Sequence, residues 1–203
     1  GLSGMIAANT AAGRLKFTMD LAAAVSTADA IFIAVGTPSR RGDGHADLTY
    51  VFEAAKEIAA AARPGAVIVT KSTVPVGSGR QDAAAIRAER PGLDFDVASN
   101  PEFLREGSAI GDFMRPDRVV IGAESPRAAN LLRALYRPLQ LNDAQLVVVD
   151  LETAELIKYA ANAFLATKIA FINEMADVAE AVGADIEGVA RGMGLDQRIG
   201  ARF

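Results

Sequence analysis

The sequence contains no cysteine and only one histidine, His45, among its 203 residues. The missing thiol excludes disulfides, thiolate metal sites and a cysteine nucleophile within this chain. A single histidine argues against a Ser-His-Asp triad and against a histidine-rich metal site, so we predict no metal centre. His45 stands in the polar, glycine-rich stretch RRGDGHADL, for which we expect solvent exposure.

Basic clusters and long apolar runs are also lacking. The formal net charge is -4, and the lysines and arginines are scattered, which argues against a nucleic-acid or anionic-membrane surface. No apolar run approaches the roughly 20 residues that a helix needs to cross a bilayer. The chain does not begin with a basic segment followed by an apolar block, so we expect no secretory signal and a cytoplasmic location.

Short β-branched apolar runs alternate with alanine-rich helical patterns up to about Asp150. This alternation predicts an α/β fold with a Rossmann-like, doubly wound parallel sheet whose strands are covered on both faces. The predicted strands are Ala30 to Val35, Ala66 to Thr70, Phe95 to Ala98, Arg118 to Ile121 and Gln145 to Val149. The predicted helices are Leu48 to Ala62 with Asp47 as N-cap, Val76 to Arg90, and Pro126 to Tyr136.

From Leu151 the residue pattern changes to that of one long helix, which ends at Gly183. Such a helix would cross a whole domain, so we expect it to link two lobes or to form a subunit interface. A shorter helix, Ile186 to Arg191, leads into a loop-like end. We therefore predict a partial Rossmann-like domain at residues 1–150, and the long helix with the start of a second, helical domain at 151–203.

The two ends of the sequence predict a fragment. Gly1 lies inside what reads as a helix already under way, and the chain stops at Phe203 without a closing element. A sheet of this kind should also begin with a glycine-rich phosphate turn, G-x-G-x-x-G, and none occurs.

Small polar residues follow three successive predicted strands. VGTPS contributes Thr37, KSTVPVG contributes Ser72 and Thr73, and NPEFLREG contributes Glu102 and Glu106. Ligands of open parallel sheets bind outside the carboxyl ends of the strands, and the helix after KSTVPVG would favour an anion at its N-terminus. If NPEFLREG turns helical, its two glutamates share one face. Capping alone does not explain three such strand ends, so we predict a ligand site.

The long helix also carries polar side chains. Lys158 and Asn162 lie four residues apart and share a face among apolar neighbours. They would present donors toward an anion or a developing oxyanion, although a lysine can also extend its charged end to solvent. Arg198, in RIG, could clamp a carboxylate or a phosphate, or could simply be exposed.

The chain resembles the UDP-glucose dehydrogenase family of nucleotide-sugar dehydrogenases over essentially all of its length. The resemblance rests on VGTPS, KSTVPVG, NPEFLREGSAIGDFMRPDRVVIG, ELIKYAANAFLATKIAFINE and GLDQRIG. It implies NAD-dependent oxidation of the C6 alcohol of UDP-glucose to the carboxylate of UDP-glucuronate, in two hydride transfers, for polysaccharide biosynthesis. It also implies a homodimer through the long helix and a C-terminal domain that binds the nucleotide.

The resemblance further implies roles for individual residues. The catalytic groups would be Glu102 as acid/base, Lys158 and Asn162 as donors to the oxygen at C6, and Thr37 beside a catalytic water. The residues that contact the cofactor would be Thr37, Thr73 and Glu106, with Glu106 on the nicotinamide side. The substrate-binding residues would be Glu102, Phe103, Leu104, Arg105, Glu106, Lys158, Asn162 and Arg198, with the backbone of 103–105 lining the sugar nucleotide and Arg198 reaching a neighbouring subunit.

Two parts of the family's machinery are not in this sequence. The nucleophilic cysteine, in a G-x-G-G-S-C-type loop, would follow Phe203, and the phosphate turn would precede Gly1, so we expect the chain by itself to be inactive. A GDP-mannose dehydrogenase, which shares NPEFLREG, is one alternative. UDP-N-acetylmannosamine dehydrogenases fit less well, because their sequence differs at this block. A catalytically dead oligomerisation module built on the long helix is the remaining alternative.

Overall fold

The computed structural model describes residues 1–140 and 144–201. The chain forms two compact units, Gly1–Lys158 and Tyr159–Phe203. The long helix α7 (Leu151–Val182) begins in the first unit and continues into the second. The domain boundary predicted between residues 150 and 151 stays a prediction. The predicted loop-like end is described as far as Ala201, and its last two residues lie outside the described part of the chain.

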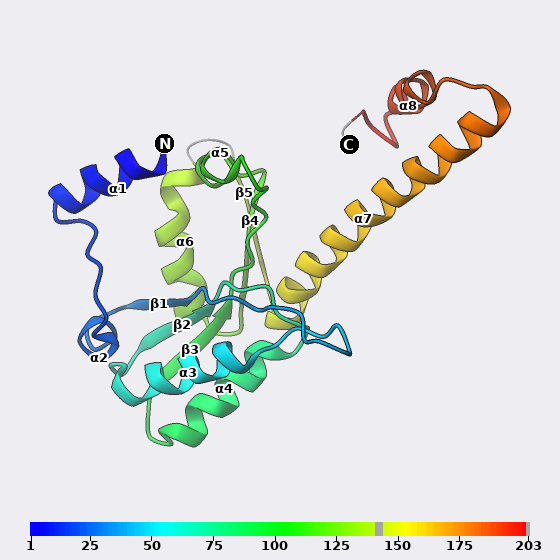
Figure 1. Ribbon diagram of the computed structural model, residues 1–203. Helices are drawn as coiled ribbons and strands as arrows, with labels where there is room; N and C mark the ends of the chain where they lie inside the picture. Colours follow the sequence, from blue (N-terminus) through cyan, green and yellow to red (C-terminus); the bar gives the residue numbers. More distant parts are fainter. Residues whose placement is uncertain (141–143, 202–203) are drawn as a thin grey trace. The chain divides into compact units, whose positions relative to one another are not determined.

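The first unit contains a five-stranded sheet with strand order β1-β2-β3-β4-β5 (Figure 1). Its strands lie within two residues of the predicted bounds. Neighbouring strands are parallel from β1 to β3 and again from β4 to β5. The bounds are β1 Ala30–Ile33, β2 Ala66–Thr70, β3 Phe95–Ser99, β4 Arg118–Ala123 and β5 Gln145–Val149.

One pairing departs from the predicted parallel pattern, because β4 runs antiparallel to β3. Only two residue pairs join them, Ala98 with Ala123 and Ser99 with Gly122. A parallel connection needs a long crossover, usually through a full helix, whereas the segment between these strands holds only the six-residue helix α5 (Ala109–Met114). The chain therefore turns back, and the start of β4 extends beyond the carboxyl end of β3.

Helices cover both faces of the sheet, as a doubly wound fold requires. Ile31, Ile33 and Ile68 pack in one buried cluster with α3 and α4, and Val67 and Val69 pack in another with α6. Figure 1 shows α3 and α4 together on one side of the sheet. The remaining bounds are α1 Leu2–Ala11, α2 Leu21–Val25, α3 Thr49–Ala61, α4 Ser78–Glu89, α6 Pro126–Gln140 and α8 Ile186–Gly194.

Most of the predicted helices are confirmed, but α2 and α5 were not predicted. Both are short, at five and six residues, so they show too little of a helical repeat to be recognised. Asp47 is not the N-cap of α3 as predicted, because the helix begins one residue later and its N-cap is Leu48. The Asp47 side chain still accepts from the backbone N–H of Thr49 at 3.0 Å. Gly183 ends α7 as predicted, with a φ of 74° that favours glycine.

The start of α7 is fixed to the start of α4 by Glu155. Its two carboxylate oxygens accept the backbone N–H groups of Gly77, at 2.6 Å, and Gly79, at 2.8 Å. The carboxylate thereby satisfies free donors in the first turn of α4 and meets the positive end of its dipole. The anion that the sequence predicts at this helix N-terminus is therefore the buried carboxylate of Glu155 and not a ligand.

Gly122 of β4 lies against the first turn of α7. A Cβ at this position would stand 2.6 Å from the Cβ of Ala154 and 2.9 Å from the carbonyl oxygen of Asp150. The same Asp150 begins α7, because its side chain accepts from the backbone N–H of Thr153 at 2.7 Å. Only glycine therefore fits here without moving the start of the helix.

We expect Gly122→Ala to destabilise the chain by about 1–3 kcal/mol, because the added methyl group overpacks the contact with α7. The measurement is urea unfolding of the purified chain. Gly92→Ala is the matched control, since nothing lies within 4 Å of a Cβ at Gly92. Equal stability of the two variants would show that β4 does not press on α7.

A second carboxyl group, that of Asp82 on α4, is buried near Glu155. Its Oδ2 accepts from the hydroxyl of Thr70 at 2.8 Å, and its Oδ1 has no hydrogen-bond partner within the described part of the chain. Burial raises the pKa of Asp82 to about 6; the Thr70 hydrogen bond opposes this rise, and the charge of Glu155 adds to it. Near neutral pH, the ionised carboxylate of Asp82 therefore destabilises the folded chain.

The raised pKa predicts how Asp82→Asn changes stability with pH. The folded chain binds the proton of the Asp82 carboxyl group more tightly than the unfolded chain does. The stabilisation from that protonated group is therefore complete below the ordinary pKa of 3.8 and is lost as pH rises through about 6. Asparagine can still accept from Thr70 and cannot ionise. We expect Asp82→Asn to be more stable than the parent by about 3 kcal/mol near pH 8 and no more stable near pH 4. Urea unfolding at both pH values checks this, and a gain independent of pH would contradict it.

Candidate functional site

Glu102 and Lys158, predicted from two separate motifs, form an ion pair. The Lys158 Nζ lies 3.0 Å from the Glu102 Oε1, and the two side chains are 8% and 32% exposed, respectively. Glu102 is the third residue after β3, and Lys158 is the third residue after Glu155. The turn of α7 that docks on α4 therefore also places the ammonium beside the carboxyl end of β3.

The surroundings of Glu102 favour its charged form. Its Oε2 accepts the backbone N–H of Leu104 at 2.6 Å. Burial by itself raises the pKa of Glu102, but the Leu104 N–H, the Lys158 hydrogen bond and the charges of Lys158 and Lys71 outweigh burial and hold the pKa below its usual value. Glu102 is therefore an anion near neutral pH, a state that can accept a proton but cannot donate one.

Two cationic side chains lie close to the ring of Phe103. The guanidinium carbon of Arg118 lies 3.9 Å from the ring centroid, and the Nζ of Lys158 lies 5.3 Å from it. The antiparallel course of β4 brings Arg118, at the start of that strand, alongside the loop after β3. Cations over an aromatic face are attracted by its negative charge, so Phe103 helps to hold Lys158 in place.

The backbone donors expected to line the substrate are engaged within the loop. The N–H of Leu104 donates to Glu102, and the N–H of Arg105 donates to Asp112 at 2.9 Å. The guanidinium of Arg105 also pairs with Asp112, at 2.6 Å. These contacts hold the loop from Glu102 to Asp112 in one conformation.

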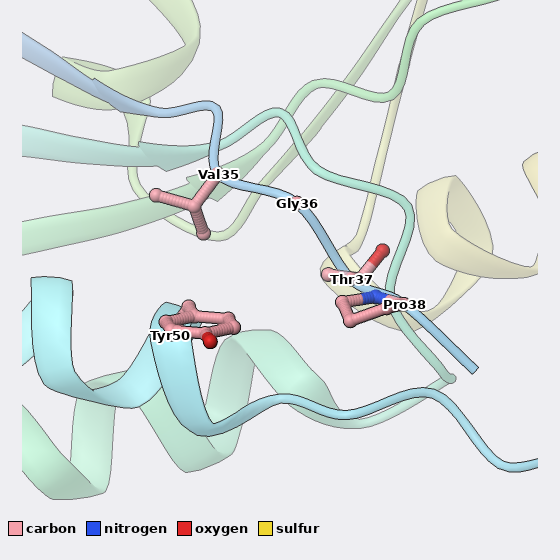
Figure 2. Close-up of a pocket in the computed structure, with 5 residues that line it drawn as sticks. All are labelled: Val35, Gly36, Thr37, Pro38 and Tyr50. Carbon is pink, nitrogen blue, oxygen red and sulfur yellow. The ribbon is translucent and has the colours of Figure 1, made fainter. Parts of the chain in front are cut away.

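Thr37 and Thr73, the predicted cofactor contacts, meet at the carboxyl ends of β1 and β2. The Thr37 hydroxyl donates to the carbonyl oxygen of Thr73 at 3.0 Å. A pocket of about 780 Å³ opens beside Thr37, and Figure 2 shows the ring of Tyr50 facing Val35 across it. Its lining is Val35, Gly36, Thr37, Pro38 and Tyr50.

This pocket fits part of a dinucleotide cofactor. It lies outside the carboxyl end of β1, where open α/β sheets bind their ligands. Val35, Pro38 and Tyr50 offer apolar walls, Thr37 offers a hydroxyl, and nothing stands within 4 Å of a Cβ at Gly36. A flat ring such as nicotinamide, with one polar edge, suits such a lining.

Three other predicted site residues are exposed. Glu106 lies in an irregular loop that turns helical only at Ala109, so the two glutamates of NPEFLREG do not share a helix face. Asn162 is exposed on the part of α7 that belongs to the second unit. Arg198, in the same unit, has an 89% exposed side chain and pairs with Asp196 at 2.7 Å.

The structure adds three residues that we did not single out from the sequence. Lys71 directly follows β2 and Asn100 directly follows β3, and the two strands end level with each other. The Lys71 Nζ donates to the side-chain oxygen of Asn100 at 3.1 Å, and the hydroxyl of Tyr136 on α6 donates to the same oxygen. The predicted parallel register would have placed Lys71 and Asn100 side by side, whereas nothing local marks Tyr136.

The described part of the chain offers no metal site and no membrane-spanning helix. Across residues 1–140 and 144–201, no three His, Cys, Asp or Glu side chains gather in a group that could hold a metal ion. None of the described helices is long and apolar enough to cross a membrane. His45 is exposed as predicted, and its backbone N–H donates to Asp43 at 3.0 Å.

Comparisons with known proteins give the same family for both parts of the chain. Residues 1–140 match the NAD binding domain of the UDP-glucose/GDP-mannose dehydrogenase family, and residues 152–203 match its central domain. UDP-glucose 6-dehydrogenase of Rhizobium meliloti is 59% identical over 205 residues, which cover all of this chain and 47% of that protein. The chain thus spans about half the length of the curated relatives it matches.

Solved structures agree with these matches. A UDP-glucose dehydrogenase from Pyrobaculum islandicum superposes with a TM-score of 0.89 at 47% identity, over 95% of this chain and 45% of that one. A GDP-mannose dehydrogenase from Pseudomonas aeruginosa gives 0.91 at 36% identity, over 98% and 46%. The chain belongs to the UDP-glucose/GDP-mannose dehydrogenase family.

Proposed function

We propose that this chain is part of an NAD-dependent enzyme that oxidises the C6 alcohol of UDP-glucose to the carboxylate of UDP-glucuronate. The observation that carries the proposal is the ion pair of Glu102 and Lys158 beside the sheet's carboxyl edge. The chain is also 59% identical to a UDP-glucose 6-dehydrogenase. Oxidation of an alcohol needs a base for its proton and a donor for the charge that develops on its oxygen, and this pair supplies both.

The two residues have different tasks in this proposal. Lys158 donates to the oxygen at C6, where its charge is most useful once negative charge develops. Glu102, held as an anion, accepts a proton, with Thr37 beside the water that relays it. NAD, when bound, would take up the hydride released at each of the two oxidation steps, and water would supply the second carboxylate oxygen. Thr37, Thr73 and Glu106 are the proposed cofactor contacts, and Asn162 is the proposed second donor.

The substrate would contact the loop after β3. Phe103, Leu104 and Arg105 are the proposed contacts there, together with Glu102 and Glu106. Arg198 is proposed to reach the substrate of a neighbouring subunit. A cytoplasmic location stays a prediction.

GDP-mannose is the alternative substrate, because the backbone superposes about equally well on the Pseudomonas aeruginosa GDP-mannose dehydrogenase, with a TM-score of 0.91 against 0.89. Sequence identity favours UDP-glucose, at 47% against 36% for the same two structures. A dead oligomerisation module would not need a lysine with an 8% exposed side chain paired to a glutamate.

The test is a full-length chimera in which this chain replaces the matching segment of the Rhizobium meliloti enzyme. Production of NADH, followed by its absorbance, should be observed with UDP-glucose, because this chain would supply Glu102 and Lys158 while the Rhizobium meliloti enzyme supplies the remaining parts. The isolated chain should be inactive, because it contains no cysteine and no G-x-G-x-x-G turn. A folded chimera that does not oxidise UDP-glucose would overturn the proposal.

Lys158→Ala in the chimera should lower the turnover number by about 100- to 1000-fold while the Michaelis constant changes little, because an oxyanion donor acts chiefly in the transition state. Steady-state kinetics with UDP-glucose measures both constants. Lys56→Ala, at an exposed lysine of α3, is the matched control. If Lys158→Ala raised only the Michaelis constant, Lys158 would be a binding residue.

We also propose that the chain forms a symmetric dimer through α7, between Leu156 and Ala181. Phe164, Phe171 and Val178 follow one another at intervals of seven residues, and their side chains are 65%, 49% and 51% exposed. Residues seven apart lie on one side of a helix and form the stripe that a partner helix covers. An exposed apolar stripe of this kind is unusual on a monomeric protein.

Sedimentation of the purified chain at micromolar concentration should therefore show a dimer, and the double variant Phe164→Asp, Phe171→Asp should be a monomer because it places charges on the stripe. Asn173→Asp is the control, since it adds charge to the same helix away from the stripe. A monomeric parent chain, or an unchanged dimer in the double variant, would count against this interface.

A further inference from the structure

Lys71 and Glu102 follow the carboxyl ends of neighbouring strands, since β2 and β3 end level with each other at Thr70 and Ser99. Lys71 is the residue directly after β2, and its Nζ donates to both oxygens of Asn100, to the side chain at 3.1 Å and to the carbonyl at 3.3 Å. The same Nζ lies 6.0 Å from the centroid of the Tyr136 ring. A partly buried lysine with two such acceptors has little freedom to swing toward solvent.

Asn100 is held firmly enough to serve as the anchor for Lys71. It is 1% exposed, and its backbone N–H donates to the carbonyl of Thr70 at 2.9 Å. Its side-chain nitrogen donates to the carbonyl of Val120 at 2.7 Å. That bond fixes which way the amide points, so its oxygen must face Lys71 and the hydroxyl of Tyr136.

The charges around this group act on one another. Burial lowers the pKa of Lys71, the charge of Glu102 raises it, and the charge of Lys158 lowers it. The charge of Lys71 in turn lowers the pKa of Glu102. Burial raises the pKa of Tyr136 to about 12, so its hydroxyl is a neutral donor. Arg118, at the start of β4, is a further charged group that packs on this loop, and it lies over Phe103.

We propose that Lys71 is a positioning residue of the site, a second ammonium fixed by Asn100 and Tyr136 that keeps Glu102 an anion. The proposal rests on the function proposed above. In that reaction Lys158 must turn its hydrogen bonds toward the substrate oxygen, and Glu102 then loses part of its partner's attraction. Lys71 faces Asn100 and stays in place, so Glu102 remains ready to accept a proton throughout the reaction.

The direct test is a titration of Glu102 in this chain, by NMR of ¹³C-labelled glutamate carboxyl groups, with the Glu102 signal assigned by its loss in Glu102→Gln. In Lys71→Met the midpoint should move to higher pH. In Lys71→Arg, which keeps the charge, it should stay close to that of the parent, as it should in the control Lys56→Met. Tyr136→Phe should move it in the same direction as Lys71→Met, by less. An unchanged midpoint in Lys71→Met or, if that variant does not fold, in Tyr136→Phe would overturn the proposal.

The second readout is the pH dependence of the turnover number in the chimera. Lys71→Met should lose about twofold in turnover number near pH 5 and nothing measurable near pH 9, because more Glu102 is protonated in acid. A loss of the same size at every pH would show a merely structural role and overturn the proposal. If the parent chimera oxidises no UDP-glucose while Lys71→Met still shifts the Glu102 titration, the proposed function fails and the role of Lys71 on Glu102 stands.

Discussion

The contact between Glu155 and the first turn of α4 fixes the position of the first turns of α7 and, with it, where Lys158 lies. Two backbone N–H groups at 2.6 and 2.8 Å hold the carboxylate, and hydrogen bonds to charged groups are worth about 1.5–3 kcal/mol each. Lys158 follows three residues later on the same helix and meets Glu102. Gly122 allows α7 to approach β4 closely. The structural carboxylate of Glu155 thus determines where Lys158 lies relative to the carboxylate of Glu102.

The strands and helices that are encoded locally were predicted well. β2 and β5 have the predicted bounds, and α7 ends where Gly183 takes a positive φ. Strand direction is not local information, since an apolar run reads the same either way. The antiparallel course of β4 depends on the connection before it, which turns back through one short helix instead of crossing the sheet.

The same distinction separates the site residues that were predicted from those that were not. Glu102 and Lys158 carry charge at a strand end and on an apolar helix face, and both features are visible in the sequence. Glu155 and Tyr136 matter through partners 78 and 36 residues away in the chain. The sequence motif around Glu155 contains nothing that separates a helix-capping glutamate from a solvated one.

Asn100 illustrates how a chain can protect a buried amide over time. Conversion of an asparagine to aspartate begins when the backbone nitrogen of the next residue attacks the side-chain amide. That next residue is Pro101, whose nitrogen carries no hydrogen and cannot form the usual cyclic imide. The amide that orients Lys71 and Tyr136 is therefore shielded from the commonest spontaneous damage to asparagine. Pro101, the second residue of the NPEFLREG motif, therefore protects Asn100 through its backbone nitrogen and not through any contact of its side chain.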